Sequence, residues 1–162
     1  MAVVDSSALI PLAWVGRLDL LEAVFGDLRT VEAVREEVVT AGKPGTASLE
    51  QFLDDVPIHE VPAEASEVAS MEGIERTDAG VVLLADQRDC PLVANDKGLI
   101  SVARSHGVDC VWVTSVLLRA TNDDVLSSEE ASRVCYDLVD EGMNLHPKVY
   151  SRVQKALDEL GE

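Results

Sequence analysis

Four acidic side chains stand where a folded α/β chain can bring them together: Asp5, Glu37, Asp78 and Asp96. Asp5 and Asp96 each follow a short apolar run of the kind that forms a buried strand. The carboxyl ends of strands line the ligand crevice of open α/β sheets, so we expect both carboxylates at one sheet edge. Asp78 falls in the first turn of a predicted helix, and Glu37 lies within another. The sequence therefore predicts an acidic site that only the fold can assemble.

Gathered carboxylates predict a metal ion, because their charges repel one another and lose hydration unless a cation compensates them. The three cysteines are widely spaced and the three histidines form no paired motif, which argues against zinc. Oxygen ligands favour Mg²⁺ or Mn²⁺. Such an ion activates water for attack at phosphorus. With 30 acids in the chain, chance placement at strand ends stays open as the alternative.

The elements that must position these acids alternate between strand and helix. Short β-branched runs predict strands at 2–4, 28–31, 57–61, 91–94 and 109–113. Helical patterns begin near residues 8, 32, 47, 63, 77 and 98. Thr77 is the expected N-cap of the helix that begins near residue 77. The segment 41–45 is a cluster of residues that break helices and strands. This alternation is typical of a mostly parallel sheet with helices on both faces. At 162 residues we expect one domain over 1–162.

Two further helices are predicted at the C-terminal end. Ser127 and Glu130 have the spacing of a capping box, which opens a helix that Gly142 can stop. His146-Pro147 opens the last, amphipathic helix. We expect the helices of about 127–162 to pack on the domain or to extend it. The apolar runs are far shorter than the roughly 20 residues of a membrane span, and we expect a cytoplasmic protein.

The net charge of −17 argues against a conventional basic nucleic-acid binder. The 13 basic residues are mostly arginine, with lysine only at Lys43, Lys97, Lys148 and Lys155, and the acids are spread along the whole chain. A soluble protein with this composition resembles those of halophilic organisms. In molar salt the Debye length falls to about 3 Å, so a distributed acidic surface scarcely repels a polyanion. An ordinary acidic protein is the alternative.

Several stretches resemble the PIN domain, the nuclease fold of VapC-type toxins and related archaeal proteins. They are VVDSSALIPLA at 3–13, AVREEV at 33–38, the segment from Thr77 to Val108, and LHPKVYSRVQKALDELGE at 145–162. The resemblance implies a three-layer α/β/α PIN-like fold, in which helices flank a central, mostly parallel sheet. It also implies a Mg²⁺- or Mn²⁺-dependent endoribonuclease that cleaves RNA phosphodiester bonds.

The resemblance assigns roles to particular residues. The catalytic acids of the family map to Asp5, Glu37, Asp78 and Asp96. Asp5 and Asp96 would bind the metal directly, Asp78 directly or through water, and Glu37 would orient the attacking water. Ser7 and Asn95 would support the site. Many members carry a further acid where this chain has the segment 97–100, so a second tightly held metal is in doubt.

Partners follow from the same resemblance: RNA, an antitoxin protein, and a second copy in a homodimer. Lys97 and Arg104 lie just beyond the acids and are candidates for substrate phosphates, with solvated helix surface as the alternative. A non-catalytic PIN-fold module that binds RNA or protein is the competing function. A haloacid dehalogenase-type hydrolase would need Asp-x-Asp at the first strand, but Asp5 is followed by Ser6 and Ser7.

Overall fold

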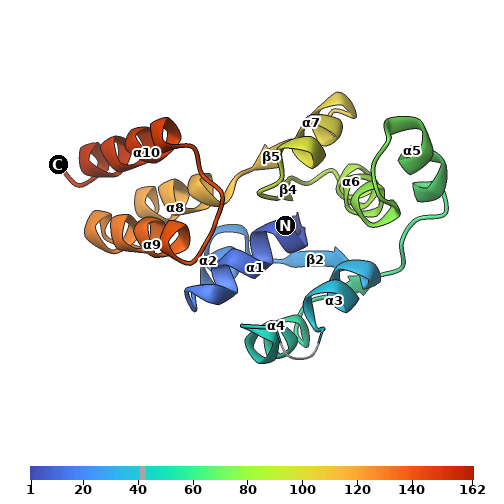
Figure 1. Ribbon diagram of the computed structural model, residues 1–162, viewed down its shortest axis with the longest axis horizontal. Helices are drawn as coiled ribbons and strands as arrows, with labels where there is room; N and C mark the ends of the chain where they lie inside the picture. The colour runs from blue at the N-terminus through green and yellow to red at the C-terminus, as the bar shows by residue number, and fades with distance from the viewer. Residues whose placement is uncertain (41–42) are drawn as a thin grey trace.

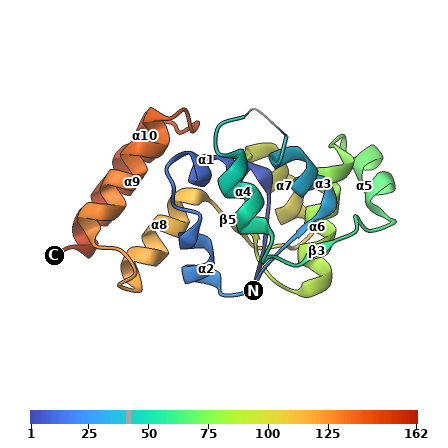
Figure 2. The ribbon, with the colours of Figure 1, turned by 90° about the horizontal axis from the view of Figure 1, so that it is seen from below.

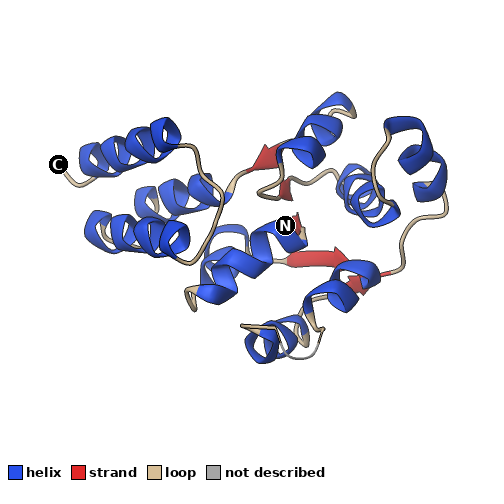
Figure 3. Cartoon of the chain, viewed as in Figure 1, coloured by secondary structure: helices blue, strands red, loops and turns tan. Residues whose placement is uncertain are grey.

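A computed structural model describes residues 1–40 and 43–162, so the expected breaker at 41–45 lies partly outside the described residues. Within the described part, five strands form one sheet in the order β3-β2-β1-β4-β5. The strands are β1 (Ala2–Val4), β2 (Leu28–Val31), β3 (Ile58–His59), β4 (Leu92–Val93) and β5 (Cys110–Val111). Every neighbouring pair is parallel, so all the carboxyl ends meet at one edge. Figure 3 shows the strands at the centre of the molecule with helices around them.

Helices cover both faces of the sheet. They are α1 (Ser6–Trp14), α2 (Asp19–Phe25), α3 (Glu32–Val38), α4 (Thr46–Leu53), α5 (Ala65–Glu72), α6 (Arg76–Arg88), α7 (Lys97–Ser105), α8 (Val113–Asn122), α9 (Ser128–Asp140) and α10 (Pro147–Leu160). Helix α6 packs on β1, β2 and β4, and α7 packs on β5, while α2 and α3 contact β2 from the other side. Figure 1 shows α6 and α7 across the strands from α1, α3 and α4. The expected three-layer α/β/α fold is confirmed.

The core forms where apolar residues of the strands meet the two helical layers. Every residue of β1 is buried, and its register places Val3 beside Leu92 and Val4 beside Val93. A parallel strand covered on both faces reads as a continuous apolar run, which is why the sequence pattern located it. The buried polar residue Thr30 satisfies its hydroxyl by donating to the Val4 carbonyl oxygen at 2.7 Å.

Two helices begin earlier than expected, and both differences affect the site. Helix α1 begins at Ser6 rather than near Ala8, because the carboxylate of Asp5 is the N-cap. Helix α6 begins at Arg76 with Glu75 at the N-cap, so the expected capping role of Thr77 is wrong. Asp78 nevertheless stays in the first turn of α6, as predicted.

The C-terminal helices lie together at one end of the molecule. Figures 1 and 2 show α8, α9 and α10 grouped at the end away from α5. Each of the three helices packs on the other two. Ser127 is the N-cap of α9, as expected, and its hydroxyl accepts from the Glu130 amide at 3.1 Å and lies 3.2 Å from Oε1 of Glu130. Helix α8 was not expected: its first residue, Val113, was assigned to the last strand. No helix in the described part of the chain has the length and apolarity that crossing a membrane requires.

Candidate active site at the carboxyl edge of the sheet

Asp5 is the most buried of the predicted acids, with 3% of its surface exposed. It follows β1 directly, and its backbone amide donates to the Val93 carbonyl of β4 at 3.0 Å. Its Oδ2 accepts from the amide of Ser7 at 3.1 Å and from the Ser7 hydroxyl at 2.6 Å. Its Oδ1 is buried without a hydrogen-bond partner among the described residues. Burial raises the pKa of Asp5, although the hydrogen bonds from Ser7 act in the opposite direction.

Ser7 connects the ends of two neighbouring strands. Its hydroxyl donates to Asp5 and accepts from the backbone amide of Asn95, at 2.9 Å. Asn95 and Asp96 follow β4, so this bond joins the end of β4 to the start of α1. Asp96 caps α7, its Oδ1 accepting from the Leu99 amide at 3.1 Å. Both acids thus use one oxygen to order the backbone at the carboxyl edge.

Asp78 lies in the first turn of α6, near the other acids. Burial raises the pKa of Asp78 to about 6, and the negative charges of Asp5, Asp96, Glu75 and Glu37 add to that effect. The first turn of α6 therefore faces the ends of β1 and β4. The sequence analysis missed Glu75; its position three residues before Asp78 places it one helical turn away, and this spacing was the available signal.

Glu37 is the outermost member of the group and is exposed on α3. Partial burial raises the pKa of Glu37, and the charges of Asp5 and Glu75 raise it further, while Ser6 and Lys43 oppose the shift. The structure thus brings Glu37 within electrostatic range of Asp5 although 32 residues of sequence, 37 − 5, separate them. The acids form a group that spans β1, α3, α6 and the end of β4.

The two candidate cations occupy different ends of α7. Lys97 is the first residue of the helix and follows Asp96, so it is beside the acids, and it is exposed. Arg104 lies in the last turn and, with Arg119, lines a hollow of about 610 Å³ around the start of β5. Because α7 runs antiparallel to the strands, Arg104 is at the amino edge of the sheet, away from the acids.

The residues at the carboxyl edge fit a divalent cation in donor chemistry. Oδ1 of Asp5 is a buried carboxylate oxygen without a partner among the described residues, and burial and then neighbouring negative charge raise the pKa of Asp78. A cation would relieve both. Within the described residues, no three His, Cys, Asp or Glu side chains form a ready-made metal cage. Mg²⁺ does not require one, because it usually keeps several waters and takes one or two carboxylates.

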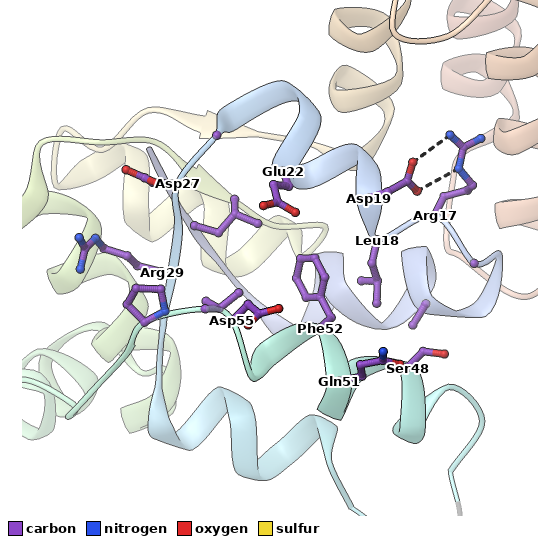
Figure 4. Close-up of a pocket in the computed structure, with 16 residues that line it drawn as sticks. Arg17, Leu18, Asp19, Glu22, Asp27, Arg29, Ser48, Gln51, Phe52 and Asp55 are labelled. Carbon is purple, nitrogen blue, oxygen red and sulfur yellow. Dashed lines mark hydrogen bonds and ion pairs between the residues drawn. The ribbon is translucent and has the colours of Figure 1, made fainter.

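A cavity of about 730 Å³ lies at the opposite, amino edge of the sheet. Figure 4 shows Phe52 of α4 and Leu18 facing this space, with the ion pair between Arg17 and Asp19 at its rim, 3.0 Å apart. None of the four predicted acids lines it. The candidate chemistry is therefore at a charged sheet edge and not in this hollow.

A parallel α/β/α sandwich with acids grouped at its carboxyl edge is consistent with a PIN-like fold. The sequence model of the family described as "DUF3368: PIN domain" matches residues 1–159. The chain belongs to this family of PIN domains, whose members are generally nucleases.

A solved structure supports the fold. The chain is similar to PAE2754 from Pyrobaculum aerophilum, with a TM-score of 0.55 and 22% sequence identity. The alignment covers 74% of this chain and 96% of that one. A search of curated proteins found no match. At this identity the likeness concerns the fold alone.

Proposed function

We propose that the protein is a metal-dependent endoribonuclease, with Asp5, Glu37, Asp78 and Asp96 as its catalytic acids. The observation that carries the proposal is the buried, unpartnered Oδ1 of Asp5 near Asp78, whose pKa is raised to about 6 by burial and then by the charges of neighbouring carboxylates. A purely structural acid would use both oxygens in hydrogen bonds or remain in water. Membership of the PIN family supports the same function.

Asp5, Asp96 and Asp78 would hold Mg²⁺ or Mn²⁺, which supplies Lewis-acid activation of water and charge stabilisation at phosphorus when bound. Ser7 holds Oδ2 of Asp5, so that Oδ1 stays directed away from the helix backbone. Asp96 is oriented in the same way by the Leu99 amide. Glu37 is exposed and has a raised pKa, so it suits an acceptor for a proton of the attacking water.

Lys97 belongs to the same proposal as a contact for the phosphates of RNA, because it is exposed at the acidic edge. We do not include Arg104 in this phosphate contact, since Arg104 lies at the other end of α7. Lys97 also bears on the number of metals: the segment 97–100, where many related proteins carry a further acid, has none here. The proposal therefore includes one tightly bound metal.

The test is cleavage of single-stranded RNA in Mn²⁺ by the variants Asp5→Asn and Asp96→Asn. Asparagine keeps a carbonyl oxygen for the capping bonds but removes the charge, so we expect loss of cleavage with retained fold. The matched control is Asp140→Asn, an exposed residue at the end of α9. Circular dichroism checks folding of all three proteins. Wild-type activity in both site variants contradicts the proposal.

A non-catalytic RNA- or protein-binding module is the second candidate. The absence of a ready-made metal cage within the described residues favours it, as does the lack of an acid at 97–100. Calorimetric titration with Mn²⁺ separates the two functions. Binding that disappears in Asp96→Asn supports the nuclease, and no binding to the wild-type protein supports the module.

The resemblance to VapC-type toxins extends the proposal to a toxin that pairs with an antitoxin protein and forms a homodimer. Expression of the wild-type chain alone is then expected to arrest growth of a host cell through RNA cleavage. Expression of Asp5→Asn at the same level is the control, and it should leave growth unchanged. Equal growth with both proteins would contradict the toxin role but not the nuclease activity.

A further inference from the structure

A second buried polar atom lacks a partner, and it belongs to a residue outside the acidic group. Among the described residues, only Oδ1 of Asp5 and Nε of Arg29 are buried without a hydrogen bond. A buried guanidinium N–H without an acceptor is as costly as a buried carboxylate oxygen without a donor. Arg29 is in β2, and Figure 4 shows its guanidinium directed away from Phe52 and Leu18.

Arg29 is tied to the neighbouring strand by one of its other nitrogens. Its Nη1 lies 3.0 Å from Nε2 of His59 in β3. Because arginine only donates, Nε2 accepts and the His59 ring is neutral in this bond. Strand pairing places Val31 beside His59, and side chains alternate along a strand, so Arg29 and His59 share one face of the sheet.

Arg88 adds a second guanidinium to this face. It is exposed in the last turn of α6, the helix that packs on β1 and β2. Burial lowers the pKa of His59, and the positive charges of Arg88 and then Arg29 lower it further. Both arginines also act on the thiol of Cys90, opposing the rise that burial causes in its pKa. The two guanidinium groups therefore lie close to the same side chains.

The acids of the chain leave both arginines uncompensated. Asp27, Asp86 and Asp89 are near them in sequence, yet among the described residues no ion pair within 4.0 Å joins a carboxylate to Arg29 or Arg88. An anionic ligand from outside the chain would supply the missing acceptor.

We propose that Arg29, His59 and Arg88 form a binding site for a phosphate group. The two guanidinium groups together carry more N–H donors than the two oxygens of one planar carboxylate can accept. A phosphate group offers oxygens in several directions and can accept more of them. The neutral His59 ring adds an N–H from Nδ1, since Nε2 accepts from Arg29. Binding of phosphate would also supply an acceptor for Nε of Arg29.

This site is separate from the candidate active site. Asp78 and Arg88 are at opposite ends of α6, ten residues apart, and a helix rises 1.5 Å per residue, so about 15 Å separates them along the axis. His59 is at the end of β3, and β2 separates that strand from β1 and from the Asp5 that follows it. If the protein is not a nuclease, the proposal of a phosphate site still stands. If phosphate does not bind, the nuclease proposal still stands.

The experiment is a titration of His59 followed by NMR, with the wild-type protein in EDTA so that RNA cleavage does not interfere. Inorganic phosphate is the first probe. A bound anion favours the protonated imidazole, so we expect phosphate to raise the His59 pKa in a saturable way. A His59 pKa that stays unchanged at every phosphate concentration overturns the proposal, because a purely structural bond between Arg29 and His59 predicts no change.

Variants connect the response to the arginines. Arg88→Gln removes an exposed side chain and should keep the fold, and we expect it to weaken phosphate binding about tenfold, the effect of losing one charge-assisted hydrogen bond. Arg29→Gln should abolish binding, with circular dichroism as the check on folding. The matched control is Arg152→Gln, an exposed arginine of α10. Equal phosphate affinities of Arg88→Gln and Arg152→Gln would contradict the assignment.

Two short oligoribonucleotides identify the source of the phosphate. One carries a 5′-phosphate and the other a 5′-hydroxyl group. A rise in the His59 pKa with the first alone supports a terminal phosphate of RNA as the ligand. A rise with inorganic phosphate but with neither oligonucleotide supports a small free phosphate. Absence of any change with all three probes overturns the site.

Discussion

At the scale of single residues, the carboxylates of the site differ because their surroundings differ. Asp5 is buried and ordered by Ser7, Asp96 is exposed and caps a helix, and Asp78 lies between these extremes. Of these, Asp78 has a pKa near the pH range in which enzymes work, because burial and four neighbouring acids all favour its protonated form. Its protonation state is therefore sensitive to pH and to bound cations.

The raised pKa of Asp78 predicts a pH-dependent cost to folding. In the unfolded chain Asp78 ionises near pH 3.8, but in the metal-free native state it does so near pH 6. Between these values the native state binds more protons, so this residue lowers the free energy of unfolding as the pH rises. We expect Asp78→Asn to raise the free energy of unfolding by about 1 kcal/mol at pH 8, after allowance for partial solvent screening. Below pH 4 we expect the substitution to have little effect on that free energy.

Urea denaturation of both proteins in EDTA measures this difference. Saturating Mn²⁺ provides the internal control: if Asp78 helps to hold the ion, the metal should stabilise the wild-type protein more than the variant. A stabilisation by Asp78→Asn that is equal at pH 4 and pH 8 would show that the charge of Asp78 is not its cause.

At the scale of elements, the ends of β1 and β4 are held together by side chains as well as by strand pairing. The Ser7 hydroxyl joins the first turn of α1 to the backbone after β4, through Asp5 on one side and Asn95 on the other. The two acids that follow these strands therefore occupy a common, rigid edge. A substitution that breaks this connection should loosen the site without unfolding the sheet.

Ser7→Ala tests this connection. The change removes one donor to Asp5 and one acceptor for Asn95, so we expect the free energy of unfolding to fall by about 1 to 3 kcal/mol. Mn²⁺ affinity should fall as well, because Asp5 loses the bond that orients it. Ser101→Ala, an exposed position on α7, is the control for a serine outside the site. Unchanged Mn²⁺ affinity in Ser7→Ala would show that Asp5 is positioned by the backbone alone.

At the scale of the whole molecule, the dominant property is negative charge. The excess of 30 acids over 13 lysines and arginines is distributed over both helical layers, and few of these acids form ion pairs within the described part. Such a surface destabilises the compact state by self-repulsion at low ionic strength. Added salt screens that repulsion, which connects the composition to the expectation of a halophilic source.

Stability should therefore increase with salt. Between about 0.1 M and about 1 M KCl the Debye length falls from about 10 Å to about 3 Å, and we expect the melting temperature to rise over that range. The control is Asp123→Asn/Asp124→Asn, which removes two exposed acids from the C-terminal end of α8. This variant should be more stable than wild type in low salt and show a weaker dependence on KCl. A flat or falling melting temperature would contradict the argument.

Local patterns were sufficient to predict the class of fold and the strands that Asp5 and Asp96 follow. Strand runs such as 2–4 and 91–94 are apolar because both faces of a parallel sheet are covered, and the acids that follow them are necessarily at the carboxyl edge. The predicted starts of α1 and α6 were wrong by one or two residues. The carboxylate of Asp5 caps α1 in place of a serine, and Glu75 is the N-cap of α6 without a side-chain capping bond.

By itself, the sequence determined the order of the elements and placed Asp5 and Asp96 at strand ends, since both depend on the periodicity of neighbouring residues. Only the tertiary structure decided which polar atoms are left without partners. Burial of Oδ1 of Asp5 and of Nε of Arg29 depends on packing between elements distant in sequence. The pKa of Asp78 also depends on this packing, because acids from four segments contribute to it. So does the position of Arg104, which the length of α7 separates from the acids. Distances between elements depend on packing and topology, which local periodicity does not encode.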